Sequence, residues 1–257
     1  SVKLQKSLHR QLAPQSQLVI DATAPGRVER LLDVGCGAGE TTLQLASAVG
    51  PDGAVTGVDI SRPMLEVARR RAAGLPNVAF READAQTHRF EPASYDAVFS
   101  RFGVMFFADP AAAFTNIRSA LKPGGRLGFV CWRTPPESPI MVLPIMAAAQ
   151  HLPPPAPPEP GAPGPFAFAD AERLRGILDA AGFRDVAITP RDLKVGGGDV
   201  EAALRLALRV GPLGGVLRDN PDKRDVAEAA VRAALVQHDG PDGVKLGAGV
   251  WVVTARA

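Results

Sequence analysis

The sequence predicts an α/β protein in which a parallel sheet is covered by helices on both faces. Short apolar runs alternate with helical patterns along the first half of the chain, which is typical of such sheets. Within residues 31–46, an apolar run holds Asp33, three alternating glycines follow at Gly35, Gly37 and Gly39, and a helical pattern begins. A strand, a glycine loop and a helix in this order hold a nucleotide-like ligand against backbone amides.

The elements of the first half follow from short apolar runs separated by turn residues and helical patterns. Strands are expected at Arg30–Val34, Ala54–Asp59, Val78–Glu82, Tyr95–Ser100 and Arg126–Trp132. Helices are expected at Glu40–Val49, Met64–Ala73 and Pro110–Leu121. Ser61 is expected to cap the second of these helices, and residues 122–125, Lys-Pro-Gly-Gly, to form a turn.

The pattern changes after Trp132, where a proline-rich tract and longer connections appear. Residues 1–28 are expected to contain a helix or two that lead into the fold. The elements expected in the second half are helices at Ile140–Gln150, Asp170–Ala181, Val200–Leu208 and Asp222–Gln237, and strands at Val186–Thr189 and Gly249–Ala255.

We predict a single domain, 1–257, with insertions at 134–165 and 191–246 that act as lids over a substrate site. Two alternatives remain open for these insertions. The composition of the proline-rich tract at 153–165 favours a stiff surface linker, and the apolar insertions are also suited to a homodimer interface.

The composition argues against several classes of binding partner. The chain has 257 residues, a net charge of +2 and interspersed charges without a basic run, so no nucleic-acid partner is expected. The two cysteines, Cys36 and Cys131, do not suggest a disulfide framework, and we expect a cytoplasmic location. We expect no metal, because no Cys/His cluster has ligand spacing, and no membrane contact, because no apolar run approaches about 20 residues.

The glycine loop carries the strongest chemical signal. A dinucleotide fingerprint would place its third glycine at position 40, where this chain has Glu40. An acid before the loop, Asp33, suits a ligand with a cationic amine, whereas an acid at the end of the loop would repel a pyrophosphate. The loop therefore favours a nucleoside that bears an amino acid over a nicotinamide dinucleotide. The alternative is a tight turn that binds nothing.

Two further acids follow strands. Asp59 ends the second strand, where a carboxylate accepts hydrogen bonds from ribose hydroxyls, and its alternative role is to cap the next helix. Asp84 follows the third strand and suits an adenine amino group, with the Ala85 amide donating to the ring; the alternative is an Asp that bonds its own backbone. Ile60 and Met64 are spaced to cover a purine face, or to pack in the core.

Taken together, these motifs resemble those of the class I S-adenosylmethionine-dependent methyltransferases, over residues 28–132 and more weakly over 170–189. The matching segments are Asp33–Gly39, Val58–Ile60, Ala83–Ala85, Tyr95–Ser100 and Leu121–Gly125. The resemblance implies S-adenosyl-L-methionine as cofactor and a Rossmann-like sheet of seven strands with the last one antiparallel.

The same resemblance assigns roles to residues of this chain. The cofactor's methionine part is expected at Asp33, Gly35, Cys36, Gly37 and Gly39, its ribose at Asp59 and its adenine at Asp84. Ser100 and Arg101, at the end of the fourth strand, are expected at the methionine end and toward the substrate. DNA amino-methylating enzymes of this fold carry an Asn/Asp-Pro-Pro-aromatic motif there, whereas this chain has Ser-Arg-Phe-Gly, which disfavours base methylation.

On the acceptor side, we predict catalytic roles for three residues. His9 and His151 are candidate bases, and Arg101 is a candidate to orient an anionic or carbonyl-bearing substrate, or else a partner in a salt bridge. An apolar set is expected to wall a pocket for a small-molecule acceptor: Phe102, Met105, Phe106, Phe107, Trp132, Met141, Met146, Phe166 and Phe168.

We therefore expect methyl transfer to a small molecule, first of all O-methylation of a hydroxylated aromatic or polyketide-like compound. Transfer to nitrogen or carbon stays open. Two other functions remain as alternatives: a cofactor-binding protein without catalysis, and a nicotinamide-dependent oxidoreductase.

Overall fold

A computed structural model describes residues 15–153, 161–196, 198–208 and 212–257. The described residues divide into two compact units. The sheet unit comprises residues 15–132, 161–190 and 251–257, and the helical unit comprises 133–153 and the described part of 191–250. The expected insertions at 134–165 and 191–246 fall largely within the helical unit. Their role as lids, like the single-domain organisation, stays a prediction.

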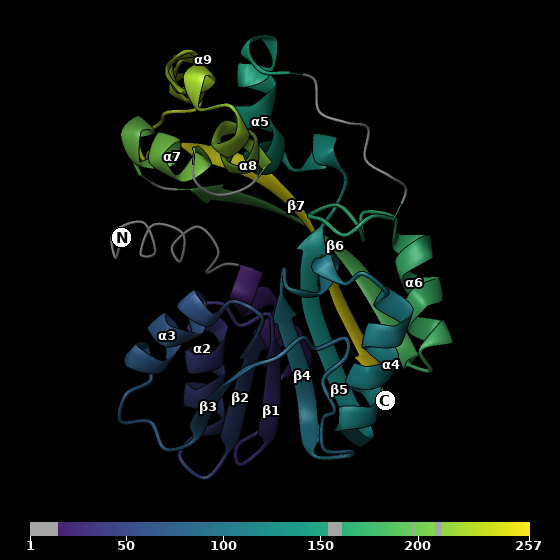
Figure 1. Cartoon of the computed structure of the whole chain (residues 1–257). Helices are drawn as coiled ribbons and strands as arrows, with labels where there is room; N and C mark the ends of the chain where they lie inside the picture. The colour runs from purple at the N-terminus through teal and green to yellow at the C-terminus, as the bar shows by residue number, and fades with distance from the viewer. Residues whose placement is uncertain (1–14, 154–160, 197, 209–211) are drawn as a thin grey trace. The chain divides into compact units, whose positions relative to one another are not determined.

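In the described part of the chain, seven strands form one sheet in the order β3-β2-β1-β4-β5-β7-β6 (Figure 1). Their bounds are β1 Arg30–Val34, β2 Ala54–Asp59, β3 Val78–Glu82, β4 Tyr95–Arg101, β5 Leu121–Trp132, β6 Arg184–Gly196 and β7 Lys245–Arg256. The first five strands pair in parallel.

The strand β7 runs against β5. At one end of the pair the Ala257 amide donates to Gly125, and at the other the Arg133 amide donates to Gly249. The expected Rossmann-like fold class, with its antiparallel last strand, is confirmed.

Helices flank the strands of the sheet unit, with α2 and α3 drawn beside β1–β3 in Figure 1. Their bounds are α2 Glu40–Val49, α3 Arg62–Arg71, α4 Pro110–Ala120 and α6 Ala171–Ala180, preceded by a helix at 15–23. Two begin at aspartate caps: Asp109 accepts from the Ala112 amide, and Asp170 from the next turn. Ser61 holds the N-cap position of α3 as expected, but its side chain makes no capping hydrogen bond.

The core of the sheet unit is apolar on both faces of the central strands, because a parallel sheet is covered on both sides. One cluster includes the fully buried Leu31, Leu45 and Phe99. A second is aromatic and centres on Phe114 of α4, whose ring lies 5.5–6.5 Å from four others: Phe107, Phe129, Phe168 and Phe183. This aromatic cluster fixes α4 and the loop before it against the sheet.

The helical unit contains α5 Pro139–Ala148, α7 Val200–Ala207, α8 Pro212–Asp219 and α9 Arg224–Val236, and short 3₁₀ turns that include Ala149–His151. Its core is aliphatic, with Leu204, Leu217, Val231 and Leu235 buried. No helix among the described residues is both long enough and apolar enough to span a lipid bilayer.

The structure differs from the expected elements at several places. Residues 122–125 do not form a separate turn but belong to β5, where a register shift opposite Tyr95–Ala97 and a positive φ at Gly124 absorb the glycines. The strand expected at Val186–Thr189 extends over Arg184–Gly196, because it continues into the helical unit. The helix α8 was missed, because its two glycines weaken the helical pattern.

The aromatic cluster gives a stability prediction. Phe114→Ala removes a fully buried ring that touches four others, and we expect the free energy of unfolding to fall by about 3–5 kcal/mol. Urea denaturation followed by circular dichroism measures this. Leu75→Ala, at a side chain that is 42% exposed, is the control and should cost under about 1 kcal/mol. A small effect of Phe114→Ala would contradict the cluster's role.

Candidate functional site

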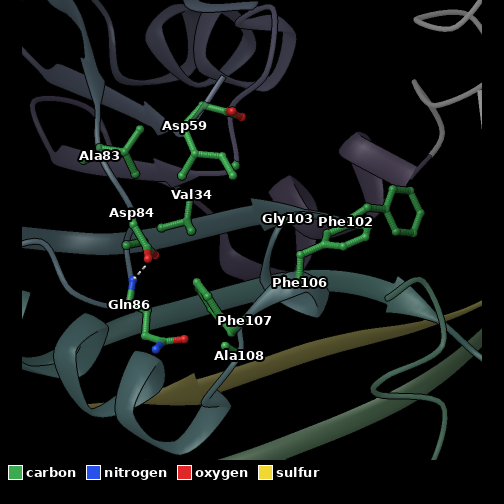
Figure 2. A pocket seen from close by; sticks show the side chains of 14 residues that line it. Val34, Asp59, Ala83, Asp84, Gln86, Phe102, Gly103, Phe106, Phe107 and Ala108 are labelled. Atoms are coloured by element: carbon green, nitrogen blue, oxygen red, sulfur yellow. Dashed lines mark hydrogen bonds between the residues drawn. The ribbon is translucent and has the colours of Figure 1, made fainter. Parts of the chain in front are cut away.

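A cavity of about 430 Å³ opens at the carboxyl ends of the central strands of the sheet unit (Figure 2). This volume lies in the range of small-molecule sites, and the carboxyl edge beside the β1/β4 switch in strand order is where open α/β sheets bind ligands. The lining residues come from the ends of β1 and β2 and from the segments that follow β1, β2, β3 and β4: Val34, Gly35, Val58, Asp59, Ile60, Ala83, Asp84, Ala85, Gln86, Phe102, Gly103, Phe106, Phe107 and Ala108.

The floor of the cavity depends on two glycines whose backbones touch. Gly35 follows β1 with a φ of 70°, and a Cβ placed on it would lie 2.6 Å from the Gly103 Cα. A Cβ on Gly103 would lie 2.6 Å from the Val34 carbonyl oxygen. Any side chain at either position would therefore push the loops after β1 and β4 apart.

Asp59 ties the glycine loop to the end of β2. Its Oδ2 accepts a hydrogen bond from the Gly37 amide at 2.8 Å, and its Oδ1 accepts from the Ser61 amide at 2.8 Å. The alternative of a helix cap was wrong, because Ser61 is the N-cap of α3, whereas Asp59 lines the cavity wall. Each oxygen keeps a second lone pair for another donor.

Asp33 is buried beneath the loop with one oxygen unsatisfied. Its Oδ2 accepts from the Thr42 hydroxyl at 2.6 Å, while its Oδ1 has no hydrogen-bond partner among the described residues. Burial raises the pKa of this carboxyl from 3.8 to about 6, and the Thr42 hydrogen bond and the Arg101 charge oppose the shift. An unsatisfied buried oxygen is costly, so it marks a place for a donor.

Arg71 of α3 holds the far side of the glycine loop. Its Nη1 donates to the Ala38 carbonyl at 2.8 Å, and its Nη2 pairs with the Glu40 carboxylate. The negative charge of Glu40 is therefore balanced by Arg71, which weakens the argument that Glu40 would repel a pyrophosphate. Sequence reasoning missed Arg71, which lies 31 positions from its partner.

The loop after β3 forms the polar end of the cavity. Asp84 lines this end of the cavity, and its Oδ1 accepts a hydrogen bond from the Gln86 amide at 2.9 Å. It therefore also bonds its own backbone, which was the alternative interpretation of this residue. The Gln86 side chain lines the cavity too and accepts from the Asp109 amide at 2.9 Å. Ile60 is 74% exposed and lines the cavity, which fits an apolar cover for a flat ring rather than core packing.

Aromatic residues form the other end. Figure 2 shows Phe102 and Phe106 across Gly103 from Asp84 and Gln86. The Phe102 ring stacks on Trp132, with centroids 4.4 Å apart and planes 8° from parallel.

Met105 and Phe168, expected in the same wall, are fully buried in the core and do not line this cavity. Met141 and Met146 belong to the helical unit, and Phe166 does not line the cavity either.

Several expected site residues lie beside the cavity and not in its wall. The buried Cys36 thiol packs under the loop, where burial raises its pKa, and the buried Ser100 hydroxyl accepts from the Gly103 amide at 3.1 Å. Met64 contacts the loop at Gly37. Arg101 donates to the Ser16 hydroxyl at 2.8 Å. Their roles toward a ligand stay predictions.

Of the two candidate histidines the structure describes one, His151, which is not among the residues that line the cavity. His151 ends a 3₁₀ turn in the helical unit, whereas the cavity belongs to the sheet unit. His9 lies outside the described residues. Among the residues that the structure describes, no group of three or more His, Cys, Asp or Glu side chains is arranged to hold a metal ion.

Part of the chain is similar to known methyltransferases. Residues 31–125 match the family model described as a methyltransferase domain. Aklanonic acid methyltransferase DauC of Streptomyces sp. (strain C5) is 36% identical over 118 residues, which cover 45% of this chain and 54% of that protein. Demethylmenaquinone methyltransferase of Staphylococcus aureus (strain JH9) is 42% identical over 105 residues, 41% of this chain and 43% of that protein.

The chain spans about half the length of the curated relatives it matches. The crystal structure of the YcgJ protein from Bacillus subtilis has the same fold, with a TM-score of 0.64 at 18% identity over 95% of this chain and 98% of that one. As the motifs predicted, residues 31–125 are similar to S-adenosylmethionine-dependent methyltransferases.

The described residues fit S-adenosylmethionine as cofactor. The unsatisfied Asp33 oxygen suits an ammonium group. The glycine crossing, by which we mean the contact between Gly35 and Gly103, lets a ligand approach the backbone. Asp59 and Asp84 offer hydrogen-bond acceptors at the polar end of the cavity. The volume and the apolar remainder of the lining suit a nucleoside with a thioether chain.

The raised pKa of Asp33 makes stability depend on pH. Because the folded pKa of about 6 exceeds the unfolded value, the folded state retains a proton between roughly pH 4 and 6, and the free energy of unfolding falls as pH rises through that range. Asp33→Asn should remove this fall and stabilise the protein by about 3 kcal/mol at pH 8 but by only about 1 kcal/mol near pH 4.5. Urea titrations at both pH values measure it, and equal effects at both would contradict the assignment.

The glycine crossing gives a second prediction. Gly103→Ala forces a Cβ into the Val34 carbonyl, and we expect a loss of about 1–3 kcal/mol in the free energy of unfolding together with weaker ligand binding. Gly176→Ala in α6, where a Cβ meets nothing within 4 Å, is the matched control and should stabilise the helix slightly. Thermal melts compare them, and a neutral Gly103→Ala would refute the contact.

Proposed function

We propose that this chain transfers the methyl group of S-adenosylmethionine to a small-molecule acceptor. One observation carries the proposal. Within the segment that matches a methyltransferase domain, Asp59 and Asp84 line one end of a cavity of about 430 Å³. The remaining lone pairs of Asp59 suit two ribose hydroxyls, and Asp84 suits the adenine amino group. The unsatisfied oxygen of Asp33 suits the cofactor's ammonium group.

When bound, the cofactor supplies an electrophilic methyl group on a sulfonium. The chain supplies position and a dry environment. The contact between Gly35 and Gly103 fixes the floor, Ile60 covers a flat ring, and aromatic residues line the other end. Exclusion of water and alignment are the main contributions a protein makes to such a displacement.

For the acceptor, we propose a hydroxylated aromatic or polyketide-like compound that is methylated on oxygen. The apolar, aromatic end of the cavity supports this choice, since Phe102, Phe106 and Phe107 offer rings and no charge. Two relatives are named for aklanonic acid and demethylmenaquinone, and both are small molecules. Catalytic roles for His9, His151 and Arg101, a homodimer and a cytoplasmic location belong to the proposal as predictions.

The proposal is tested at Asp59. Calorimetric titration with S-adenosylmethionine should show binding to the wild-type chain and at least about a tenfold weaker affinity for Asp59→Ala, because the variant loses the ribose acceptor and the tie to Gly37. Asp52→Ala, in an exposed turn, is the control and should bind like wild type.

Mass spectrometry of a methyl-acceptor panel then separates an enzyme from a protein that binds the cofactor without catalysis. Wild-type protein that binds NADH and not S-adenosylmethionine would overturn the proposal.

A further inference from the structure

The residue after β4 has a backbone conformation that is unusual for its type. Phe102 has a φ of 61°, in the left-handed region that glycine favours and bulky residues avoid. Its neighbour Gly103, with no side chain, has a φ of −85°. The large ring therefore occupies the strained position and the glycine the relaxed one, and such strain is concentrated at functional sites.

Two contacts hold the strained residue in place. The Phe102 amide donates to the Val130 carbonyl at 3.0 Å, and the Phe102 ring lies face to face on Trp132, the last residue of β5. Trp132 is buried, so the indole is a rigid backing for the Phe102 ring. The arrangement fixes one aromatic plane against the wall of the cavity.

A second ring at the same end of the cavity is unusually open. Phe106 is 57% exposed although it lines the cavity, whereas its neighbour Phe107 is buried in the aromatic cluster. In Figure 2 Phe102 and Phe106 lie on the side away from Asp84. The charged lining residues, Asp59 and Asp84, lie at the other end, where the proposed function puts the nucleoside.

From this geometry we infer that Phe102, backed by Trp132, is the specificity-determining residue for the acceptor, and that it selects a planar fused-ring compound by stacking. The inference rests on the proposed function, since the nucleoside must occupy the acidic end for the aromatic end to face the acceptor. Flat rings stack on an offset aromatic face with more free energy than their buried area alone provides. A saturated ring of the same size gains only the area, and a charged head group finds no partner at these side chains.

The test compares two probes that share a skeleton and a hydroxyl group: 1-naphthol, which is planar, and decahydro-1-naphthol, which is not. Each is titrated calorimetrically into the full chain saturated with S-adenosylhomocysteine. We expect 1-naphthol to bind about tenfold more tightly to the wild type. In Phe102→Leu, which keeps apolar bulk without a flat ring, the ratio of the two affinities should fall toward one, and in Phe102→Tyr it should persist.

The ratio distinguishes recognition from structural damage, because general loosening weakens both probes alike. Should Phe102→Leu fail to fold, Phe102→Met, which also keeps an apolar side chain without a flat ring, should lower the ratio in the same way. An unchanged ratio in whichever of these two variants folds, or a ratio near one in the wild type, overturns the inference. Failure of the proposed function is a separate result, namely no binding of S-adenosylhomocysteine to the wild type.

Discussion

The contact between Gly35 and Gly103 is the constraint on which the site depends. β1 and β4 are neighbours in the sheet, and the chain leaves them toward opposite sides, toward β2 from β1 and toward β5 from β4. The two departing loops can touch only because neither has a side chain at the crossing. That contact sets the glycine loop on one side of the cavity and Phe102 on the other. The polar and aromatic ends of the cavity are therefore both consequences of one backbone approach.

Two acids near this crossing differ in how their oxygens are satisfied. Asp33 is buried with an unsatisfied oxygen, and its raised pKa records the desolvation cost, which Thr42 and Arg101 offset in part. Asp59, by contrast, is satisfied by two backbone amides and gives the loop its shape before any ligand arrives. One acid thus shapes the glycine loop, and the other is the acid that we propose for the cofactor's ammonium group. Arg71 adds a clamp on the loop's outer side without entering the cavity.

Much of the sheet unit could be predicted from the sequence, because its signals are local. The bounds of β1, β2, β3 and α2 followed from apolar runs and glycines alone, and the acids at strand ends pointed to the edge where the cavity lies. What the sequence hid is long-range: the Arg71–Glu40 pair, the stack of Phe102 on Trp132, and the burial that separates Phe106 from Met105. Glycine is the residue expected in the left-handed region, yet here Phe102 adopts that conformation and Gly103 does not. The sequence gives no sign of this exchange, so only the three-dimensional structure reveals it.

The most direct measurement is a crystal structure of the chain with S-adenosylhomocysteine. We predict ribose hydroxyls within hydrogen-bond distance of Asp59, the adenine between Ile60 and Asp84, the ammonium group on the unsatisfied oxygen of Asp33, and the sulfur toward Phe102. A nucleoside bound outside this cavity, or one whose ribose does not contact Asp59, would contradict it.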